Sequence, residues 1–237
     1  MGKDVIVACD FPNAEQTLAF LDKFQGRKPF VKIGMELFYG AGPDIVRQIK
    51  ARGHKIFLDL KLHDIPNTVG HSVASVTRLG VNLITVHAGG GRAMMQAASR
   101  YAKITADELG VERPKILAVT VLTSFDDQGW QEVGGHLPIQ EHVLELAELA
   151  KNSGVDGVVA SPREAASIRK MAGNDFLIVT PGIRPSFAQT DDQKRIATPS
   201  QAFKDGSSML VIGRPITQAI DPCAAARLIL KEIKENA

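Results

Sequence analysis

Apolar and β-branched residues gather in short runs along the chain, and helix-like segments separate these runs. Eight runs are predicted to be strands, over residues 4–10, 30–34, 55–61, 81–88, 115–122, 155–161, 176–182 and 208–214. The segments between them carry helix-start signals. Capping-box patterns begin at Asn13 and at Ser161, the second with Pro162 at the first helical position, and Asp221 precedes the last helix.

Eight strand–helix units in 237 residues favour a (β/α)8 TIM barrel, a fold of about 250 residues. The alternative is a doubly wound open sheet, which usually has fewer strands and a glycine-rich first turn. Here the first strand continues instead into ACDFPNAE. Because the chain has no Ser/Gly-rich linker or break in composition, we expect a single α/β domain over residues 1–237.

The third predicted strand, KIFLDLK, ends in charged residues where a buried strand would normally stay apolar. Its even-numbered positions are aliphatic, whereas its odd-numbered positions include Asp59 and Lys61. Side chains alternate along a strand, so the aliphatic set is expected to meet the helices and the charged set to point into the barrel. The same alternation in the first two strands predicts that Asp10 and Lys32 also point inward.

These four charges would all lie at the carboxyl ends of neighbouring strands, where barrel enzymes carry their active sites. Unpaired charges there would cost several kcal/mol each, so we expect a network in which each lysine contacts carboxylates. Such a network is expected to be maintained for function. The alternative is that the charges are solvated at the strand ends and only form the rim of the barrel.

The last two predicted strands lead into loops suited to an anion. Loops after strands seven and eight commonly bind phosphate in barrels, through backbone N–H groups and arginine. Strand eight continues into Gly213 and Arg214, and strand seven into a loop with Arg184 and Gln193 that is long enough to act as a lid. The glycine-rich segment 87–92 lacks the GK[ST] ending of a P-loop and is predicted to be a tight turn into a helix.

Composition narrows the possible partners and location. The balance of 28 basic and 26 acidic residues gives +2, which disfavours nucleic-acid binding and favours a small-molecule partner. No long apolar run or leader is present, so a cytoplasmic protein without membrane contact is expected. No metal-binding or redox spacing is found among the two cysteines, Cys9 and Cys223, and the six histidines. We expect His63 to cap a helix or to pack against its neighbours.

These motifs together resemble a known family. DLKLHDIPNT (59–68) fits the DxKxxDI segment of the orotidine 5'-monophosphate decarboxylase family, bacterial type. ACDFP and VKIG resemble its first two strands, and PGIRP, QKR and VIGRPI resemble its phosphate-binding end. The resemblance runs from about Asp4 to Ala226. It implies decarboxylation of orotidine 5'-monophosphate to UMP and CO2 in de novo pyrimidine biosynthesis, without cofactor or metal.

The resemblance also implies roles for individual residues. Asp10 and Lys32 would hold the ribose hydroxyls, Asp59 would lie beside the substrate carboxylate, and Lys61 would deliver a proton to C6. The pyrimidine would contact Thr123 and Pro181, and the phosphate would be bound by Arg184, Gln193, Gly213 and Arg214. The enzyme would be a homodimer with shared active sites, each subunit giving its partner Asp64, Ile65 and Thr68.

Three other functions remain open at this point. A magnesium-dependent sugar-phosphate enzyme of the same superfamily shares the DxKxxD pattern, but it carries a metal-binding Glu where this chain has Lys32. A Schiff-base aldolase would need Lys61 as a neutral amine, which Asp59 and Asp10 disfavour. A non-catalytic nucleotide-binding barrel would keep the phosphate end without needing the charged strand ends.

Overall fold

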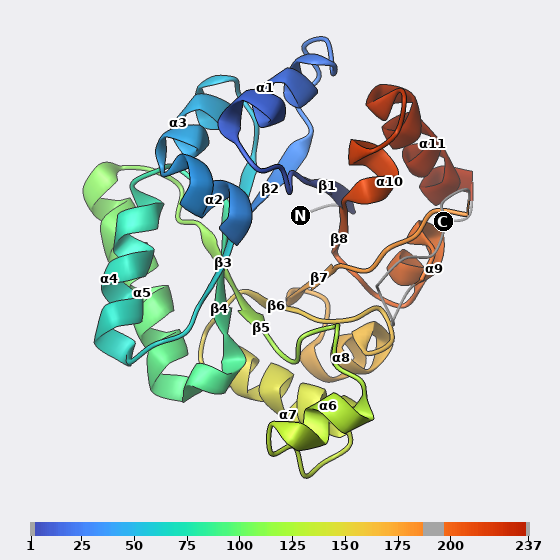
Figure 1. The fold of residues 1–237 in the computed structure, drawn as a ribbon. Helices are drawn as coiled ribbons and strands as arrows, with labels where there is room; N and C mark the ends of the chain where they lie inside the picture. Colours follow the sequence, from blue (N-terminus) through green and yellow to red (C-terminus); the bar gives the residue numbers. More distant parts are fainter. Residues whose placement is uncertain (1–2, 187–196, 236–237) are drawn as a thin grey trace.

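A computed structural model describes residues 3–186 and 197–235 of the chain. Within these residues, eight parallel strands pair in chain order and the first also pairs with the last, which closes a barrel. The helices surround this barrel (Figure 1). The prediction of a (β/α)8 barrel is therefore confirmed.

The strands occupy the predicted runs, and six of the eight are shorter than predicted; β2 has the predicted bounds and β3 is shifted by one residue. They are β1 (Asp4–Ala8), β2 (Phe30–Gly34), β3 (Ile56–Leu62), β4 (Leu83–His87), β5 (Lys115–Val119), β6 (Gly157–Val159), β7 (Leu177–Thr180) and β8 (Met209–Ile212). Most of the difference lies at the carboxyl ends. There, residues such as Asp10 and Pro181 follow the last paired position and line the barrel mouth.

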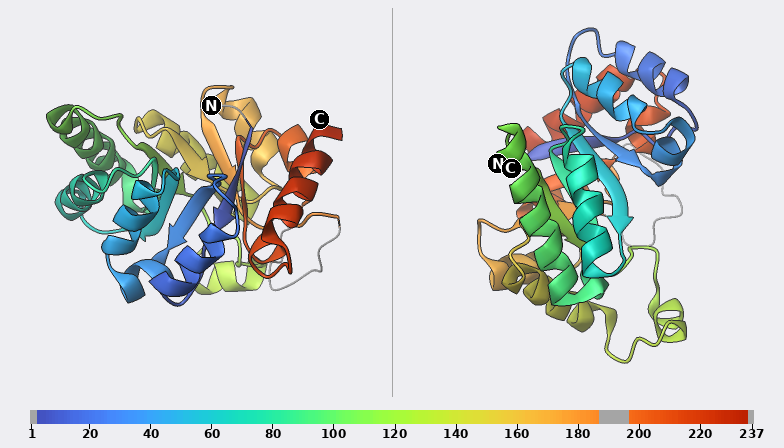
Figure 2. Two further views of the ribbon diagram at one scale, coloured as in Figure 1. Left: turned by 90° about the horizontal axis from the view of Figure 1, so that it is seen from above. Right: turned by 90° about the vertical axis from the view of Figure 1, so that its left-hand side faces the viewer.

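The connections hold more helices than one per strand. They are α1 (Ala14–Asp22), α2 (Met35–Ala41), α3 (Asp44–Ala51), α4 (Pro66–Thr77), the 3-10 turn η1 (Ala88–Gly90), α5 (Gly91–Leu109), α6 (Asp127–Glu132), α7 (Ile139–Asn152), α8 (Ala165–Ala172), α9 (Pro199–Lys204), α10 (Arg214–Thr217) and α11 (Pro222–Glu235). The helices α4 and α5 lie side by side on the outside of the barrel (Figure 2). As predicted, the glycine-rich segment after β4 is a tight turn into a helix.

Two of the three predicted helix starts are confirmed. The Asn13 side chain accepts a hydrogen bond from the Gln16 N–H (2.9 Å), and Asp221 accepts one from the Ala224 N–H (2.9 Å). The prediction at Ser161 was wrong by one turn, because α8 begins only at Ala165. In a capping box, the Glu164 side chain would reach back to the backbone N–H of Ser161. In the structure, Glu164 directly precedes α8 and is buried, with 3% of its surface exposed.

Two apolar layers confirm the alternation predicted for the strands. One set, including Ile56, Leu58 and Leu60, packs with the buried faces of the helices. The other fills the barrel interior with Ile6, Ala8, Phe30, Phe57, Leu83, Leu117, Leu177, Val179, Met209 and Val211. In the part of the chain that the structure describes, no helix has both the length and the apolar character needed to span a membrane.

Candidate active site

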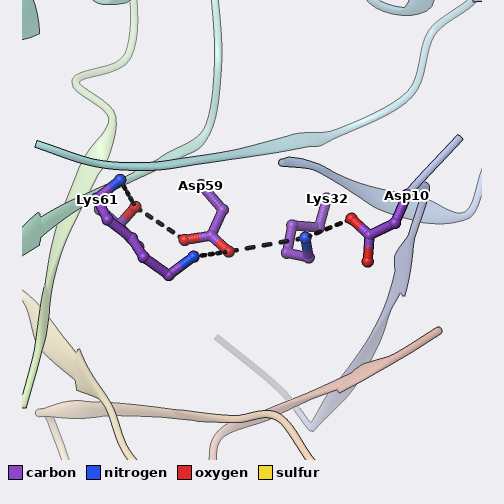
Figure 3. A network of polar contacts seen from close by, with 5 residues as sticks. Asp10, Lys32, Asp59 and Lys61 are labelled. Carbon is purple, nitrogen blue, oxygen red and sulfur yellow. Dashed lines mark hydrogen bonds and ion pairs between the residues drawn. The ribbon is translucent and has the colours of Figure 1, made fainter. Parts of the chain in front are cut away.

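Four charged side chains, three on β2 and β3 and one just after β1, form one chain of ion pairs at the barrel mouth (Figure 3). The Lys32 ammonium donates to Asp10 Oδ1 (2.9 Å) and lies 3.7 Å from Asp59 Oδ2. The same Asp59 oxygen accepts a hydrogen bond from Lys61 Nζ (2.8 Å). Each lysine therefore contacts a carboxylate, which is the alternating network that the sequence predicts.

The strand that carries Asp59 and Lys61 is not regular. Leu58 pairs with Ile84, but Leu62 pairs with Val86, so the register of β3 against β4 shifts between these rungs. Within the shifted segment, Lys61 has a φ of 52°, a left-handed conformation that side chains other than glycine rarely adopt. Lys61 points inward, as simple alternation predicted, but the cause is a bulge in β3 rather than regular alternation.

Thr85 on β4 completes the contacts of the bulged segment. Its hydroxyl donates to Asp59 Oδ1 (3.0 Å) and accepts a hydrogen bond from the Lys61 backbone N–H (2.9 Å). The residue is fully buried. Sequence reasoning missed it, although the alternation test applied to the fourth strand would have turned Thr85 inward together with Leu83.

A second residue that the sequence reasoning missed is Gly34, the last residue of β2. A Cβ added at this position would lie 3.0 Å from Lys32 Nζ and 3.1 Å from Asp10 Oδ1. The missing side chain thus leaves the room that the first ion pair of the network occupies. No sequence signal marks this role, because a glycine at the end of a strand usually indicates a turn.

The protein environment shifts the pKa of Lys32. Burial alone would lower it, but the negative charges of Asp10 and Asp59 outweigh burial and raise the pKa of Lys32 above its ordinary value of 10.5. The side chain is only 12% exposed. Lys32 is therefore a fixed positive charge between two carboxylates at neutral pH.

Two neighbours of the network are kept neutral. Burial, followed by the charge of Asp10, raises the pKa of the Cys9 thiol to about 12, so this cysteine is an inert packing group. Burial and the charges of His63 and Lys61 lower the pKa of His87. The rings of His63 and His87 stack with centroids 5.1 Å apart. His63 therefore packs against His87, which is one of the two roles predicted for it.

Two neighbouring cavities of different character lie along the network. The first, of about 150 Å³, is mainly apolar and is lined by Lys32, Phe57, Asp59, Lys61, Val119, Val121, Leu122, Thr123, Val159, Pro181 and Val211. The second, of about 240 Å³, is polar and is lined by Ala8, Asp10, Lys32, Pro181, Gly182, Arg184, Val211, Gly213 and Arg214. Lys32, Pro181 and Val211 border both. Together the cavities form one site with an apolar part and a cationic part.

Comparison with known proteins identifies the family of this site. Residues 3–229 match the Orotidine 5'-phosphate decarboxylase / HUMPS family. The chain belongs to this family. The curated orotidine 5'-phosphate decarboxylase of Lactiplantibacillus plantarum is 51% identical over 237 residues, covering 98% of this chain and 99% of that protein. The resemblance predicted from DxKxxDI and the phosphate-end motifs is thereby confirmed.

Other members extend the likeness from sequence to structure. The orotidine 5'-phosphate decarboxylase of Moorella thermoacetica is 48% identical, with coverage of 97% of this chain and 92% of that protein. The crystal structure of orotidine 5'-phosphate decarboxylase from Lactobacillus acidophilus superimposes with a TM-score of 0.86 at 46% identity, covering 97% and 98% of the two chains.

In this family member, most residues expected at the substrate lie around the two cavities. Thr123 and Pro181 line the apolar cavity, whereas Arg184, Gly213 and Arg214 line the polar one. Arg184 is only 8% exposed. Its backbone N–H donates to the carbonyl of Ala197 (2.9 Å), at the far end of the loop after β7. Gln193 and most of the proposed lid lie outside the described residues.

The three residues expected to serve a partner subunit do not line either cavity. Asp64, Ile65 and Thr68 lie after β3 and at the start of α4, and all three are exposed. Asp64 Oδ1 accepts a hydrogen bond from the Ile65 N–H (2.6 Å), and Ile65 is 66% exposed despite its apolar side chain. The single chain therefore does not bring these residues together with the charged network.

The donor set at the barrel mouth differs from that of a metal site. Among residues 3–186 and 197–235, no group of three or more His, Cys, Asp or Glu side chains is placed to hold a metal ion. Between Asp10 and Asp59 lies the ammonium of Lys32. The absence of metal and cofactor from the reaction stays a prediction.

Proposed function

We propose that this family member is an orotidine 5'-phosphate decarboxylase, a carboxy-lyase that converts orotidine 5'-monophosphate to UMP and CO2 in pyrimidine biosynthesis. The observation that carries the proposal is the Asp10–Lys32–Asp59–Lys61 network at the border of an apolar and a cationic cavity. Two relatives named orotidine 5'-phosphate decarboxylase are 48% and 51% identical over nearly the whole chain.

The two cavities suit the two ends of a pyrimidine nucleotide. The pyrimidine would fill the apolar cavity, where Thr123 would contact it and Pro181 would border the ring. The phosphate would lie against Arg184, Gly213 and Arg214, since arginine binds phosphate through paired charge-assisted hydrogen bonds. The ribose would bridge the cavities, within reach of Asp10 and Lys32.

The proposed chemistry needs charge stabilisation rather than delocalisation. Loss of CO2 from an sp2 ring carbon leaves a lone pair in the ring plane, where the π system cannot accept it. Lys61 would stabilise this developing charge and then protonate C6. Asp59 would repel the substrate carboxylate, but its larger contribution would be to aim Lys61, which it holds at 2.8 Å.

We further propose a homodimer in which Asp64, Ile65 and Thr68 complete the partner's site. Their exposure, and that of the apolar Ile65 in particular, supports this. Mixing inactive Asp64→Ala and Lys61→Ala subunits should restore part of the activity. No recovery in demonstrated heterodimers would contradict sharing. A cytoplasmic location belongs to the same proposal, and cell fractionation would test it.

The network also bears on the rival functions. A magnesium enzyme would need a ligand where Lys32 stands, and an ammonium cannot bind Mg²⁺. A Schiff-base enzyme would need Lys61 free to attack a carbonyl, whereas its ammonium is bound to Asp59. EDTA should therefore leave the activity intact, and borohydride should trap no substrate adduct on Lys61.

The deciding experiment follows the absorbance of orotidine 5'-monophosphate with the purified protein, with and without EDTA. Lys61→Ala should lose about 10⁴-fold or more in kcat, because proton transfer and charge stabilisation are lost together. It should still bind UMP. Lys103→Ala, at an exposed ion pair on α5, is the matched control and should keep full activity. No turnover by the natural protein would refute the function, and near-normal turnover by Lys61→Ala would refute the role of Lys61.

A further inference from the structure

Thr85 differs from an ordinary buried threonine because its hydroxyl bonds to two parts of the charged network. It donates to the Asp59 carboxylate and accepts from the backbone N–H of Lys61. We propose that Thr85 is a positioning residue that holds Asp59 and Lys61 in their working geometry. The kinetic side of this inference rests on the proposed decarboxylase function.

The contacts of Thr85 close a loop around Lys61. Thr85 holds the Lys61 backbone, Asp59 holds the Lys61 ammonium through Oδ2, and Thr85 holds Asp59 through Oδ1. A hydroxyl has one donor and two acceptor positions, so it can make both bonds at once. Removing the hydroxyl would therefore loosen the lysine at its backbone and at its ammonium together.

The bulge of β3 explains why a side chain is needed at this point. Between the rungs Leu58–Ile84 and Leu62–Val86, the ladder is out of register, and the Lys61 N–H donates to a side chain. Lys61 also has its left-handed φ of 52° here. Such conformations persist only where the surroundings fix them, and they gather at functional sites. Thr85 supplies that constraint.

The identity of residue 85 suits this task. A β-branched side chain has few χ1 rotamers, so the hydroxyl of a fully buried threonine is fixed in direction before any substrate binds. Valine has nearly the same shape without the hydroxyl, and serine keeps the hydroxyl without the methyl group. These two replacements separate hydrogen bonding from packing at this position.

The test compares Thr85→Val and Thr85→Ser with a control at Thr77 on α4. Thr77 is 2% exposed and its hydroxyl donates to the Val73 carbonyl (2.8 Å), so Thr77→Val removes a buried hydroxyl away from the site. We expect Thr85→Val to lose about 10- to 100-fold in kcat, the scale of a small misplacement of catalytic groups. The KM for orotidine 5'-monophosphate and the affinity for UMP should change less than about threefold, because binding contacts remain.

Thr85→Ser should recover most of the lost kcat, whereas Thr77→Val should keep the natural kcat. If Thr85→Val does not fold, Thr85→Ala replaces it in every measurement. Natural kcat in the valine or alanine variant overturns the proposal. So does a serine variant as slow as the valine variant, because then packing rather than the hydroxyl matters.

Crystal structures of the variants provide a readout that does not depend on the reaction. In Thr85→Val, Lys61 Nζ should move out of hydrogen-bond range of Asp59 Oδ2, and in Thr85→Ser the contact should remain. An unchanged Asp59–Lys61 contact in the valine variant overturns the inference. If the natural protein does not turn over orotidine 5'-monophosphate, the proposed function is refuted. The crystal structures of the variants would still decide whether Thr85 positions Asp59 and Lys61.

Discussion

Replacing Gly34 by alanine should damage the charged network while leaving the fold intact. The new Cβ would lie 3.0 Å from Lys32 Nζ and 3.1 Å from Asp10 Oδ1. Contacts this short are rare for a Cβ atom, so at least one of these groups must move by a few tenths of an ångström. Since Lys32 is 12% exposed and Asp10 is 54% exposed, we expect Asp10 to swing toward solvent.

The cost to the reaction follows from the bond that is lost. The Lys32–Asp10 bond has the 2.9 Å length of a good charge-assisted hydrogen bond. Such bonds contribute about 1.5–3 kcal/mol, and the exposure of Asp10 reduces this to about 1–2 kcal/mol. That range corresponds to about 5- to 30-fold in kcat/KM.

The stability of the fold should change little. Gly34 has a φ of −90°, which any residue can adopt. It is also the N-cap of α2, where alanine is less favourable than glycine by up to about 1 kcal/mol. Replacing glycine by alanine also restricts the unfolded chain, which stabilises the fold by about 0.4–1 kcal/mol. The two effects nearly cancel.

The assay measures initial rates of orotidine 5'-monophosphate loss and thermal unfolding for Gly34→Ala and for a control, Gly89→Ala. A Cβ at Gly89 would find its nearest neighbour, His63, at an ordinary 3.9 Å. The control should therefore keep both activity and stability. If Gly34→Ala retains natural kcat/KM and its crystal structure keeps the Lys32–Asp10 bond at its natural length, the steric reasoning is refuted.

Three further changes test other parts of the structure. Arg214→Ala should lower kcat/KM about 10- to 100-fold for the phosphorylated substrate but spare the nucleoside orotidine, because Arg214 would bind only the phosphate; equal losses would contradict this. Gly157→Ala should destabilise the barrel by about 1–3 kcal/mol or more in urea unfolding, because the new Cβ would overlap the Leu177 backbone carbonyl. An unchanged free energy of unfolding would contradict the tight packing of β6 against β7. Burial lowers the pKa of His54 below its ordinary 6.5, although a hydrogen bond between its ring and the Pro29 carbonyl acts in the opposite direction. His54 therefore binds a proton more readily in the unfolded chain than in the folded one. The contribution of neutral His54 to the free energy of unfolding should be fully present above pH 6.5 and should be lost as the pH drops through the lowered pKa. His54→Gln should flatten this fall between pH 7 and pH 5, and a parallel decline in both proteins would argue against it.

The number and spacing of the strand–helix units were sufficient to predict the barrel, and strand alternation was sufficient to predict the inward charges, although a bulge rather than regular alternation sets the direction of Lys61. In the first three strands, one face is purely apolar and must meet the helices, which leaves the barrel interior for Asp10, Lys32, Asp59 and Lys61. The pairing of these charges could also be predicted, because unpaired charges at partly buried positions are too costly. Here local pattern and tertiary structure agree.

The residues that the sequence reasoning missed depend on geometry between strands. The bulge in β3 sets a side-chain hydroxyl of β4 against the Lys61 backbone, and no pattern within either strand encodes that register shift. Alternation would have turned Thr85 inward, but threonine is common in strands, so nothing in the sequence marked it as a contact of Asp59 and Lys61. Gly34 matters because of the space beside Lys32, which is defined only after the side chains are packed.

The position of the network beside an apolar cavity determines what Lys61 can do. The cavity beside Lys61 is lined by apolar side chains that include Val119, Val121 and Val159, and the Lys61 side chain is 27% exposed. Two unit charges 4 Å apart interact by about 1 kcal/mol in water but about 4 kcal/mol at an effective dielectric constant of 20. In the proposed reaction, a pyrimidine that fills the cavity expels the water and so strengthens the effect of Lys61 on the developing charge. Binding of the phosphate in the second cavity would hold the ring there, so a group that never reacts would still lower the barrier.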